Sequence, residues 1–340
     1  MIYRFVIITV MAKEQNLNIF EGKTIVLGVT GALTCFKVCP LIQQLKNAGV
    51  RFRVVASENA LNFITKTTLQ TLTKTEVLTT QFNPKKFDEN HKPLAQEGDI
   101  FLLAPATANI ISKVANAAAD DLLSSVLCAW QKPMIIVPAM NPGMWANTAT
   151  QANISALKKR GALIVNAPKG AFPDTDLIYK ELEKVFKFQN KLKGKNILIT
   201  SGNIKENCGN FCLVADTEND YGKMLADFAH ICGAKVTLIS SKLFDAPYSQ
   251  ISVKDSKEFK ETVLQNLAGS DIFLHAAKNT PYTLIKSNNP DGKTVYTLTE
   301  TEDIFKVFSQ NKTPQQIFKA LTEEDFKDKT PQEIVEQVKC

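Results

Sequence analysis

A-P-A-T-A-N (Ala104–Asn109) and P-A-M-N-P-G-M-W (Pro138–Trp145) are the two stretches of sequence that decide the fold. Each follows a short apolar run, Ile100–Leu103 and Met134–Val137, that is typical of a buried parallel strand. Small and polar residues therefore stand at the carboxyl ends of two strands, the edge at which open α/β sheets bind ligands. Small side chains let a ligand approach the backbone, and the first turn of the following helix offers free N–H groups. These stretches predict a site for a flat, anionic cofactor.

The same alternation of strand and helix extends outward from these two stretches. We expect strands at Thr24–Val29, Phe52–Ala56 and Ala162–Val165, with a tight turn at Thr30-Gly31-Ala32. We expect helices over Leu33–Lys46, with a kink at Pro40, and over Thr68–Leu78, Ile110–Ala119 and Thr148–Arg160. Ser57 is expected to be an N-cap. The polar segment Gln81–Asn90 predicts a loop. The pattern predicts an α/β fold with a doubly wound, mostly parallel sheet and helices on both faces.

A second α/β unit follows a helix end and linker at Lys184–Lys195. We expect strands at Asn196–Thr200, Lys235–Ser240 and Ile272–His275, with helices at Lys223–Cys232 and Lys257–Leu267. The domains we predict are an extension at residues 1–22, a first domain at 23–187, a linker at 188–194 and a Rossmann-like α/β domain at 195–340. A weak repeat near the end, K-T-P-Q-Q-I-F from Lys312 and K-T-P-Q-E-I-V from Lys329, predicts two short surface helices with Thr as N-cap.

Composition limits the classes of function. The 340 residues are 44% hydrophobic, which is ordinary for a globular chain of two domains. The net charge of +6 has no dense basic block, so we expect no nucleic-acid partner, although the charge suits anionic substrates. Seven cysteines without a C-x-x-C pair favour a reduced, cytoplasmic protein. The apolar segment Met1–Val10 is too short to span a membrane, no cleavage site follows it, and Met11 is an alternative start.

A few residues could carry chemistry. His91, one of three histidines, stands in a loop before the strand at Ile100, where an imidazole can exchange protons or simply be solvated. Asn141 could hold a carboxylate or serve only as a turn residue. Met144 could contact a ligand or lie in the core, and Asp120-Asp121 could start a helix or form a solvated pair. No metal-ligand spacing and no catalytic triad motif is present in the sequence.

Taken together, these segments resemble the flavin-dependent cysteine decarboxylases, in particular the bifunctional phosphopantothenoylcysteine decarboxylase / phosphopantothenate–cysteine ligases. The resemblance runs from about Lys23 to Pro168. The matching segments are G-V-T-G-A-L-T-C-F-K (Gly28–Lys37), V-V-A-S-E-N-A-L-N-F-I-T (Val54–Thr65), His91, A-P-A-T-A-N-I-I-S-K-V-A-N-A-A-A-D-D-L-L (Ala104–Leu123) and P-A-M-N-P-G-M-W (Pro138–Trp145).

The resemblance implies a flavodoxin-like sheet and a homo-oligomer built from trimers, with FMN at the subunit interface. It implies the following site residues: Thr30, Gly31, Ala32 and Ser57 around the FMN phosphate, Thr107, Ala108 and Asn109 along the flavin, His91 as catalytic base, Asn141 on the substrate carboxylate, and Met144 beside the substrate. The implied activity is decarboxylation of 4′-phosphopantothenoylcysteine to 4′-phosphopantetheine in coenzyme A biosynthesis. In this chemistry the cofactor performs the difficult step, and the protein positions and protonates.

The chain departs from the family pattern in two places. The family's substrate lid carries a cysteine, whereas Lys169–Lys180 has none. Oxidative decarboxylation of peptidyl cysteine is therefore an alternative, and so is a non-catalytic flavoprotein that regulates a partner. The second half follows the order of the ligase domain, but E-N-D-Y (Glu218–Tyr221) and A-A-K-N-T (Ala276–Thr280) replace its nucleotide-handling residues, and its lysine-rich motif is reduced to Lys286. We expect CTP- and Mg²⁺-dependent ligation to be weak or lost.

Overall fold

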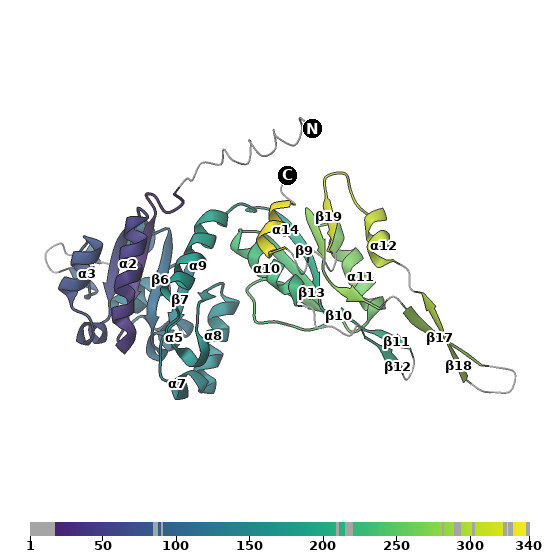
Figure 1. Cartoon of the computed structure of the whole chain (residues 1–340), viewed down its shortest axis with the longest axis horizontal. Coiled ribbons are helices and arrows are strands. Elements are labelled where there is room, and N and C mark those ends of the chain that lie inside the picture. The colour runs from purple at the N-terminus through teal and green to yellow at the C-terminus, as the bar shows by residue number, and fades with distance from the viewer. Residues whose placement is uncertain are drawn as a thin grey trace. The chain divides into compact units, whose positions relative to one another are not determined.

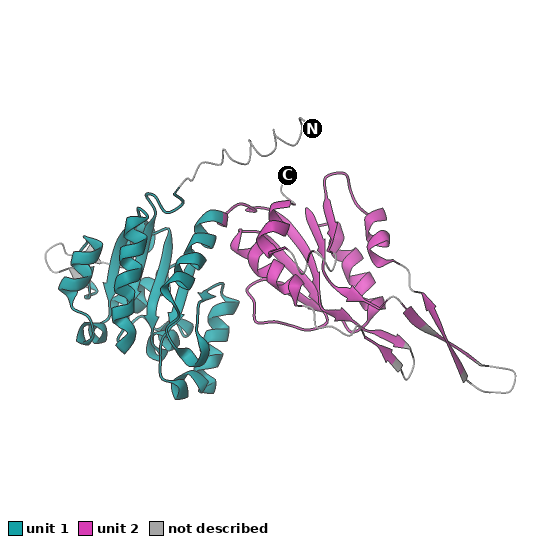
Figure 2. Cartoon of the chain, in the orientation of Figure 1, with its two compact units in different colours: residues 1–187 teal, residues 188–340 magenta. Residues whose placement is uncertain are grey.

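The computed structural model describes residues 18–83, 88–89, 91–208, 211–214, 220–280, 282–288, 294–300, 303–321, 325 and 329–337. The chain divides into two compact units, Met1–Lys187 and Phe188–Cys340 (Figures 1 and 2). Each unit contains a parallel sheet with packed helices, which confirms the predicted α/β class. The apolar segment Met1–Val10 lies outside the described residues.

The first sheet has the strand order β3-β2-β1-β6-β7-β8, and every neighbouring pair is parallel. Its strands are β1 (Thr24–Val29), β2 (Arg51–Ala56), β3 (Val77–Leu78), β6 (Ile100–Ala106), β7 (Met134–Pro138) and β8 (Leu163–Ile164). Without the two-residue edge strand β3, this is the flavodoxin-like order, which confirms the predicted doubly wound sheet. The chain reverses its direction of strand addition between β1 and β6. That switch point is where such sheets open a crevice for ligands.

The helices of the first unit form two layers. They are η1 (Leu33–Lys37), α2 (Val38–Asn47), η2 (Glu58–Asn62), α3 (Lys66–Thr73), α4 (His91–Glu97), α5 (Ala108–Ala115), α6 (Leu122–Ala129), α7 (Pro142–Ala146), α8 (Thr148–Lys159), η3 (Pro168–Gly170) and α9 (Thr175–Phe188). Helices α2 and α3 contact each other, while α4, α5, α6 and α8 form a second group of mutual contacts. Strand β6 is buried along its whole length, as expected of a strand covered on both faces.

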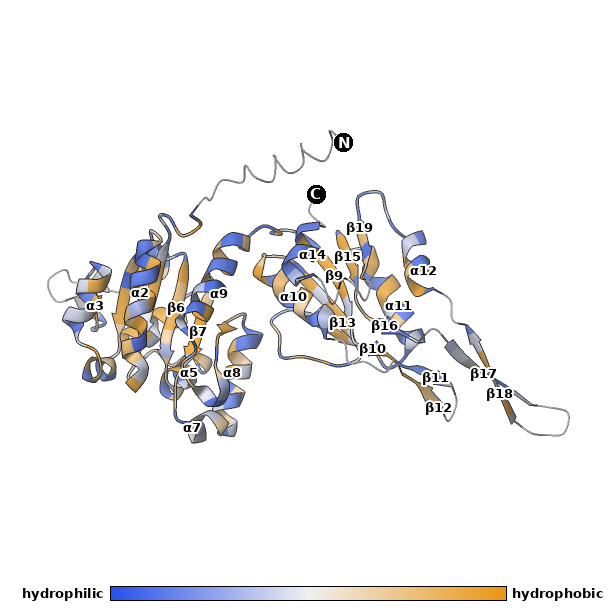
Figure 3. Ribbon diagram, in the orientation of Figure 1, coloured by the Kyte–Doolittle hydropathy of each residue, from blue (hydrophilic) through white to orange (hydrophobic). Residues whose placement is uncertain are grey.

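The first core explains why a small residue is needed in β1. A Cβ added at Gly28 would lie 2.8–2.9 Å from the side chains of Phe101, Leu103 and Leu123. Phe101 also packs edge-on against Trp130, with ring centroids 5.4 Å apart. Hydrophobic colouring follows β6 and β7 through the middle of the unit (Figure 3). The apolar runs that predicted these strands therefore form the buried core that supports the residues at the carboxyl edge of the sheet.

Two of the predicted helices need correction. The segment Leu33–Lys46 is not one kinked helix but a 3-10 turn followed by α2, and Pro40 lies in the first turn of α2, where its missing N–H has no helical partner to lose. The helix predicted over Thr68–Leu78 ends at Thr73, because Lys74 adopts a left-handed conformation and the chain then pairs as β3.

The predicted loop over Gln81–Asn90 contains a short antiparallel pair, β4 (Phe82–Asn83) and β5 (Asp88–Glu89). His91 does not lie in this loop, because it is the first residue of α4. The His91 side chain itself lies outside the described part of the structure.

The second sheet has the parallel order β14-β13-β9-β15-β19, which confirms the predicted Rossmann-like unit. Its strands are β9 (Asn196–Ser201), β13 (Lys235–Ser240), β14 (Ser249–Ser252), β15 (Ile272–His275) and β19 (Ile317–Ala320), and its helices are α10 (Tyr221–Ile231), α11 (Ser256–Leu267), α12 (Ile304–Gln310) and α14 (Pro331–Gln337). Three two-stranded pieces complete the unit: β10 (Asn203–Ile204) with β16 (Lys278–Asn279), β11 (Glu206–Cys208) with β12 (Phe211–Leu213), and β17 (Tyr282–Asn288) with β18 (Thr294–Glu300). Phe188 and Leu192, in the segment expected to be a linker, are buried in the core of this unit.

The K-T-P-Q repeat was predicted to give two surface helices, and only the second copy does. In the first copy, Ile317–Ala320 forms β19 and extends the sheet by pairing with β15, so tertiary pairing overrides the local helix signal. In the second copy, Thr330 and Glu333 cap α14 reciprocally, although Ile334 and Val335 are buried rather than on the surface. None of the helices in the described ranges has the length and apolar content that crossing a membrane requires.

Candidate functional site

A cavity of about 1010 Å³ opens at the carboxyl edge of the first sheet. It lies at the switch point between β1 and β6, and the ends of β2 and β7 also contribute to its wall. The lining includes these residues: Thr30, Gly31, Ala32, Leu33, Thr34, Lys37, Ser57, Glu58, Asn59, Thr79, Thr80, Gln81, Thr107, Asn109, Lys113, Asp120, Asp121, Met140, Asn141, Met144, Gly170, Ala171 and Phe172. The cavity therefore collects the segments that the sequence analysis singled out.

Thr30 joins the ends of β1 and β6. Thr30 is 3% exposed, and its Oγ1 donates to the carbonyl oxygen of Pro105 at 2.6 Å. Thr30 Oγ1 also accepts from the backbone N–H of Thr107 at 3.1 Å. The peptide bond between Ala104 and Pro105 is cis. Because the hydroxyl hydrogen of Thr30 is already given to Pro105, Thr30 shapes the cavity wall rather than offering a hydroxyl donor to a ligand.

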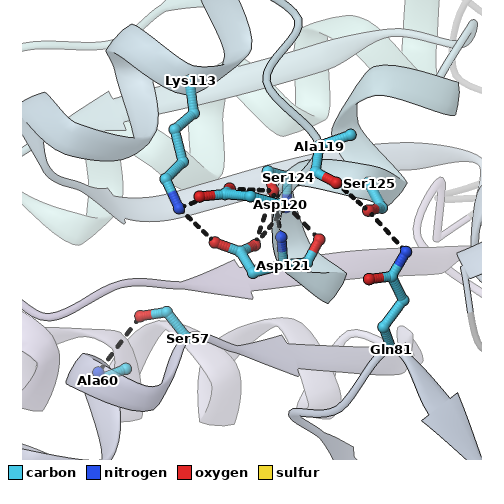
Figure 4. A network of polar contacts seen from close by, with 9 residues as sticks. All are labelled: Ser57, Ala60, Gln81, Lys113, Ala119, Asp120, Asp121, Ser124 and Ser125. Atoms are coloured by element: carbon cyan, nitrogen blue, oxygen red, sulfur yellow. Dashed lines mark hydrogen bonds and ion pairs between the residues drawn. The ribbon is translucent and has the colours of Figure 1, made fainter.

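Two turns meet at one end of the cavity. A Cβ added at Gly31 would lie 2.7–2.8 Å from atoms of Asn59, two of them backbone, so only glycine allows the turn after β1 to approach the turn after β2 this closely. Ser57 is the N-cap of η2, as predicted, and its Oγ accepts from the Ala60 N–H at 3.3 Å (Figure 4). An oxygen that accepts this bond keeps its own hydrogen to donate, so Ser57 can hydrogen-bond to an anion.

Thr34 lies on the same wall and was not identified from the sequence. Its Oγ1 is enclosed and has no hydrogen-bond partner among the described residues. Leaving a buried hydroxyl unsatisfied costs about 1–3 kcal/mol, so such atoms usually have a partner in a ligand or in water. A threonine in a glycine-containing turn is too common to be noticed from sequence alone.

Asn141 stands at the other end of the cavity, where β7 passes into α7. Its Oδ1 accepts from the Gly143 N–H at 2.8 Å, so the side chain is the N-cap of α7, and its exposed amide nitrogen keeps both hydrogens. The preceding residues are fixed by hydrogen bonds from Ala139 N to Ala106 O at 2.9 Å and from Met140 N to Gly170 O at 3.0 Å. Asn141 can therefore be a turn residue and also hold a carboxylate, because its Oδ1 serves the turn while its Nδ2 is available to a ligand.

Lys113 forms an ion-pair network in the cavity wall (Figure 4). Its Nζ lies 2.7 Å from Asp120 Oδ1 and 2.7 Å from Asp121 Oδ2. Asp121 also caps α6, accepting from Ser124 N at 2.7 Å while Ser124 Oγ accepts from Asp121 N at 3.1 Å. Of the two alternatives for Asp120-Asp121, the helix start is thus confirmed for Asp121.

These contacts shift the ionisation of all three groups. The hydrogen bonds to Asp120 and then Asp121 raise the pKa of Lys113. The hydrogen bond from Lys113 lowers the pKa of Asp120. Burial acts to raise the pKa of Asp121, but the hydrogen bonds from Lys113 and Ser124 bring it below its usual value. The network is therefore fully charged at neutral pH, and the charge of Lys113 is already balanced.

The cavity brings together most of the predicted site residues. Those that line it are Thr30, Gly31, Ala32, Ser57, Thr107, Asn109, Asn141 and Met144. Ala108 begins α5 but is not among the lining residues, and the side chain of His91 lies outside the description. Met144 is 49% exposed, so it does not lie in the core. Sequence reasoning missed Thr34, Lys37 and Lys113.

The segment that replaces the family's lid is folded in this structure. Gly170, with a φ of +73°, packs against Trp145, and Phe172 is buried while lining the cavity. Over the parts of the chain that are described, no group of three or more His, Cys, Asp or Glu side chains could hold a metal ion.

Comparisons with known proteins agree with this architecture. Residues 13–187 match the Flavoprotein family model, and residues 192–334 match the DNA/pantothenate metabolism flavoprotein C-terminal domain. The coenzyme A biosynthesis bifunctional protein CoaBC of Bacillus subtilis (strain 168) is 33% identical over 322 residues, which cover 87% of this chain and 78% of that protein. CoaBC of Vibrio vulnificus (strain YJ016) is 33% identical over 277 residues, covering 77% and 69%.

Among solved structures, the FMN-dependent cysteine decarboxylase SpaF aligns with a TM-score of 0.43 and 26% identity, covering 48% of this chain and 99% of that one. The family models span both units in order, and the Bacillus relative aligns across nearly the whole chain. The resemblance predicted from the sequence is thereby confirmed. The chain belongs to the flavoprotein family, with a DNA/pantothenate metabolism flavoprotein C-terminal domain as its second unit.

Proposed function

We propose that the first unit is an FMN-dependent decarboxylase that converts 4′-phosphopantothenoylcysteine to 4′-phosphopantetheine in coenzyme A biosynthesis. The observation that carries the proposal is the switch-point cavity of a flavoprotein-family unit, with free hydroxyl donors at one end and the Asn141 amide at the other. The similarity to two CoaBC proteins supports the pathway. A cavity of about 1010 Å³ is at the upper end of the usual range for ligand pockets, which suits a cofactor together with part of a substrate.

The residues present fit FMN. Gly31 allows the turn after β1 to approach the turn after β2 closely, and Ser57, in the second of these turns, retains a hydroxyl hydrogen for the phosphate. Thr107 and Asn109, on the first turn of α5, would lie along the flavin, with Ala108 supporting them from the same turn. When bound, FMN supplies the electron acceptor for oxidation of the cysteinyl side chain.

The chain's own residues would position the substrate and move the proton. The Asn141 Nδ2 hydrogens would hold the substrate carboxylate, and the exposed Met144 would pack beside the substrate. His91, at the start of α4, is the proposed base. An imidazole suits this role because its usual pKa is close to neutral pH.

We further propose a homo-oligomer based on trimers. Leu33 and Phe36, on η1 beside the cavity, are 76% and 59% exposed, and Phe63 is 49% exposed. An interface that covers such large apolar side chains removes them from water, which supports the proposal. Light scattering of the purified protein tests the assembly, and a monomer at micromolar concentration contradicts it.

The second unit supports a proposal of weak or absent ligation with CTP and Mg²⁺. Helix α10 still approaches strand β9 closely, as expected where a nucleotide binds at the carboxyl end of a strand. A Cβ added at Gly222 of α10 would lie 2.3 Å from the carbonyl oxygen of Thr200 in β9. The substitutions at Glu218–Tyr221 and Ala276–Thr280 remove groups that the family uses on the nucleotide. The unit would then serve mainly as a dimerising platform.

One experiment tests both activities. The purified protein, which should be yellow, is incubated with preformed 4′-phosphopantothenoylcysteine, and separately with phosphopantothenate, cysteine, CTP and Mg²⁺. We expect CO₂ and 4′-phosphopantetheine in the first reaction and little adduct in the second. A colourless protein that gains no colour from added FMN contradicts the proposal.

A third incubation, with a peptide ending in cysteine, addresses a second candidate, oxidative decarboxylation of peptidyl cysteine. The observation in its favour is that Lys169–Lys180, which includes the cavity-lining Phe172, carries no cysteine. A product two hydrogens lighter than the expected thiol, formed from a peptide ending in cysteine, identifies this activity.

A further inference from the structure

The Thr34 hydroxyl has no partner among the described residues, and one of its two usual local acceptors is already occupied. A threonine in a helical turn normally donates to the carbonyl oxygen three or four residues earlier. Four residues before Thr34 this is the Thr30 carbonyl, which accepts from Ala32 N at 2.8 Å and from Cys35 Sγ at 3.0 Å. The hydroxyl of Thr34 therefore remains enclosed in the cavity wall with no hydrogen bond among the described residues.

Cys35 maintains this arrangement. Its side chain is fully buried, and burial raises the pKa of the Cys35 thiol, so the thiol stays protonated and keeps donating to Thr30. Cys35 thus occupies one of the two carbonyl oxygens to which the Thr34 hydroxyl could turn back within its own helical turn.

The surroundings of Thr34 suit an anion. Gly31, three residues earlier, lets the turn contact the Ser57–Asn59 turn, whose serine hydroxyl also has a hydrogen to donate. Lys37 lines the same cavity with a positive charge, and Glu58 lines it with a negative one. A hydrogen bond from a hydroxyl to a charged oxygen is about twice as strong as one between neutral groups, so a phosphate satisfies this donor best.

From these contacts we infer that the Thr34 hydroxyl donates a hydrogen bond to the phosphate of the bound flavin nucleotide and makes the site select FMN over unphosphorylated riboflavin. This inference rests on the flavin site of the proposed function. It assigns a role in specificity to a residue that the family resemblance did not include.

The test compares two ligands and two variants. Thr34→Val keeps the shape of the side chain without its hydroxyl, and Thr34→Ser keeps the hydroxyl. Apo-proteins are titrated with FMN and with riboflavin in the absence of substrate, following flavin fluorescence. We expect Thr34→Val to weaken FMN binding roughly ten- to hundredfold, as loss of a hydrogen bond to a charged group does, while riboflavin binding changes less than about twofold. Thr34→Ser should bind FMN within about threefold of the wild type.

A second readout does not depend on ligand affinity. Because the hydroxyl is unsatisfied without ligand, apo Thr34→Val should unfold at a temperature equal to or above that of the apo wild type, and FMN should stabilise it less. If Thr34→Val does not fold, Thr34→Ala is titrated in the same way.

The outcomes separate this inference from the proposed function. Equal weakening of both flavins, or unchanged FMN binding, overturns it even if the enzyme decarboxylates normally. Normal selection of FMN together with a raised KM for the phosphorylated substrate also overturns it, because Thr34 would then serve the phosphate of the substrate. If the wild type binds neither flavin, the proposed function itself fails.

Discussion

Asn141 illustrates how a side chain can be fixed by the fold and still have a donor available. Its oxygen is used by the Gly143 N–H, and this bond orients the amide nitrogen. A donor that is held in place by the fold loses little entropy when it meets a carboxylate, which is the advantage of preorganisation.

Asn141 therefore permits a paired substitution. Asn141→Asp keeps a good N-cap but replaces the donor with a negative charge, so kcat/KM should fall at least about a hundredfold while thermal stability changes little. Asn141→Ala should lose activity and, in addition, about 1 kcal/mol of stability from the missing cap. Steady-state kinetics and thermal unfolding measure the two effects, and a fully active Asn141→Asp enzyme would contradict the proposed carboxylate contact.

Gly31 is limited by contact rather than by backbone conformation. A methyl group there must displace the backbone of Asn59, so Gly31→Ala should destabilise the unit by about 1–3 kcal/mol and weaken FMN binding. Gly269→Ala is the matched control, because no atom lies within 4 Å of the added Cβ, and its effect should stay within about 0.5 kcal/mol. Denaturant unfolding and flavin titration compare the two variants. Equal, small effects would show that the turn can move.

His275 makes the stability of the second unit depend on pH. Thr200 Oγ1 accepts from Ala276 N and Ala277 N, so its hydrogen is donated to His275 Nδ1 at 2.9 Å, which requires a neutral ring. Burial lowers the pKa of His275 to about 4, opposed by Asp303. The folded unit therefore binds fewer protons than the unfolded chain between pH 6.5 and about 4.

Stability should accordingly fall as the pH drops through this window. Between pH 7.5 and pH 5, His275 alone should lower the free energy of unfolding by about 2 kcal/mol. The reason is that its imidazole becomes protonated in the unfolded chain but stays neutral in the folded unit. Calorimetry at the two pH values measures the loss, and His275→Gln should show a smaller pH dependence. An unchanged pH dependence in this variant would mean that other groups are responsible.

At the scale of elements, we expect Asp121 to stabilise the first unit more as the N-cap of α6 than through its ion pair with Lys113. The side chain of Asp121 is 40% exposed, and exposed pairs contribute little, whereas an N-cap contributes about 1 kcal/mol. Asp121→Ala should therefore destabilise the unit by about 1 kcal/mol, and Asp121→Asn, which still caps, by less than half of that. Chemical denaturation distinguishes them, and equal losses would assign the stabilisation to the pairing with Lys113.

Elements also show where local pattern is insufficient. The two K-T-P-Q copies carry the same helix-start signal, yet Ile317–Ala320 pairs with β15 while Pro331–Gln337 is helical. The edge of β15 offers unpaired backbone groups to the first copy. Glu333 accepts from Thr330 N in the second copy, and Gln316 Oε1 accepts from Thr313 N at 2.9 Å at the equivalent place in the first. The difference is that the amide nitrogen of Gln316 also donates to Leu267 O and Ser270 O, which holds the first copy beside β15, whereas a carboxylate has no such donor.

At the scale of the whole molecule, each unit has its own core. The first is built around β6 and β7, and the second contains Phe188 and Leu192. A fragment ending at Lys187 should therefore fold cooperatively and bind FMN by itself. Calorimetry and flavin titration of the fragment test this. An unfolded fragment would show that the first unit needs the second.

The sequence by itself determined the fold class, the carboxyl edge that carries the site and most of the residues there, because strand periodicity and small residues at strand ends are local properties. Only the tertiary structure decided which polar atoms remain available. In it the Thr30 hydroxyl donates to the Pro105 carbonyl, and the Thr34 hydroxyl has no partner among the residues that the structure describes. It also balanced Lys113 with Asp120 and Asp121. The bond from Thr30 to Pro105 joins residues 75 positions apart in the chain, and the other assignments depend on how neighbouring turns and helices pack, so strand and helix periodicity did not reveal them.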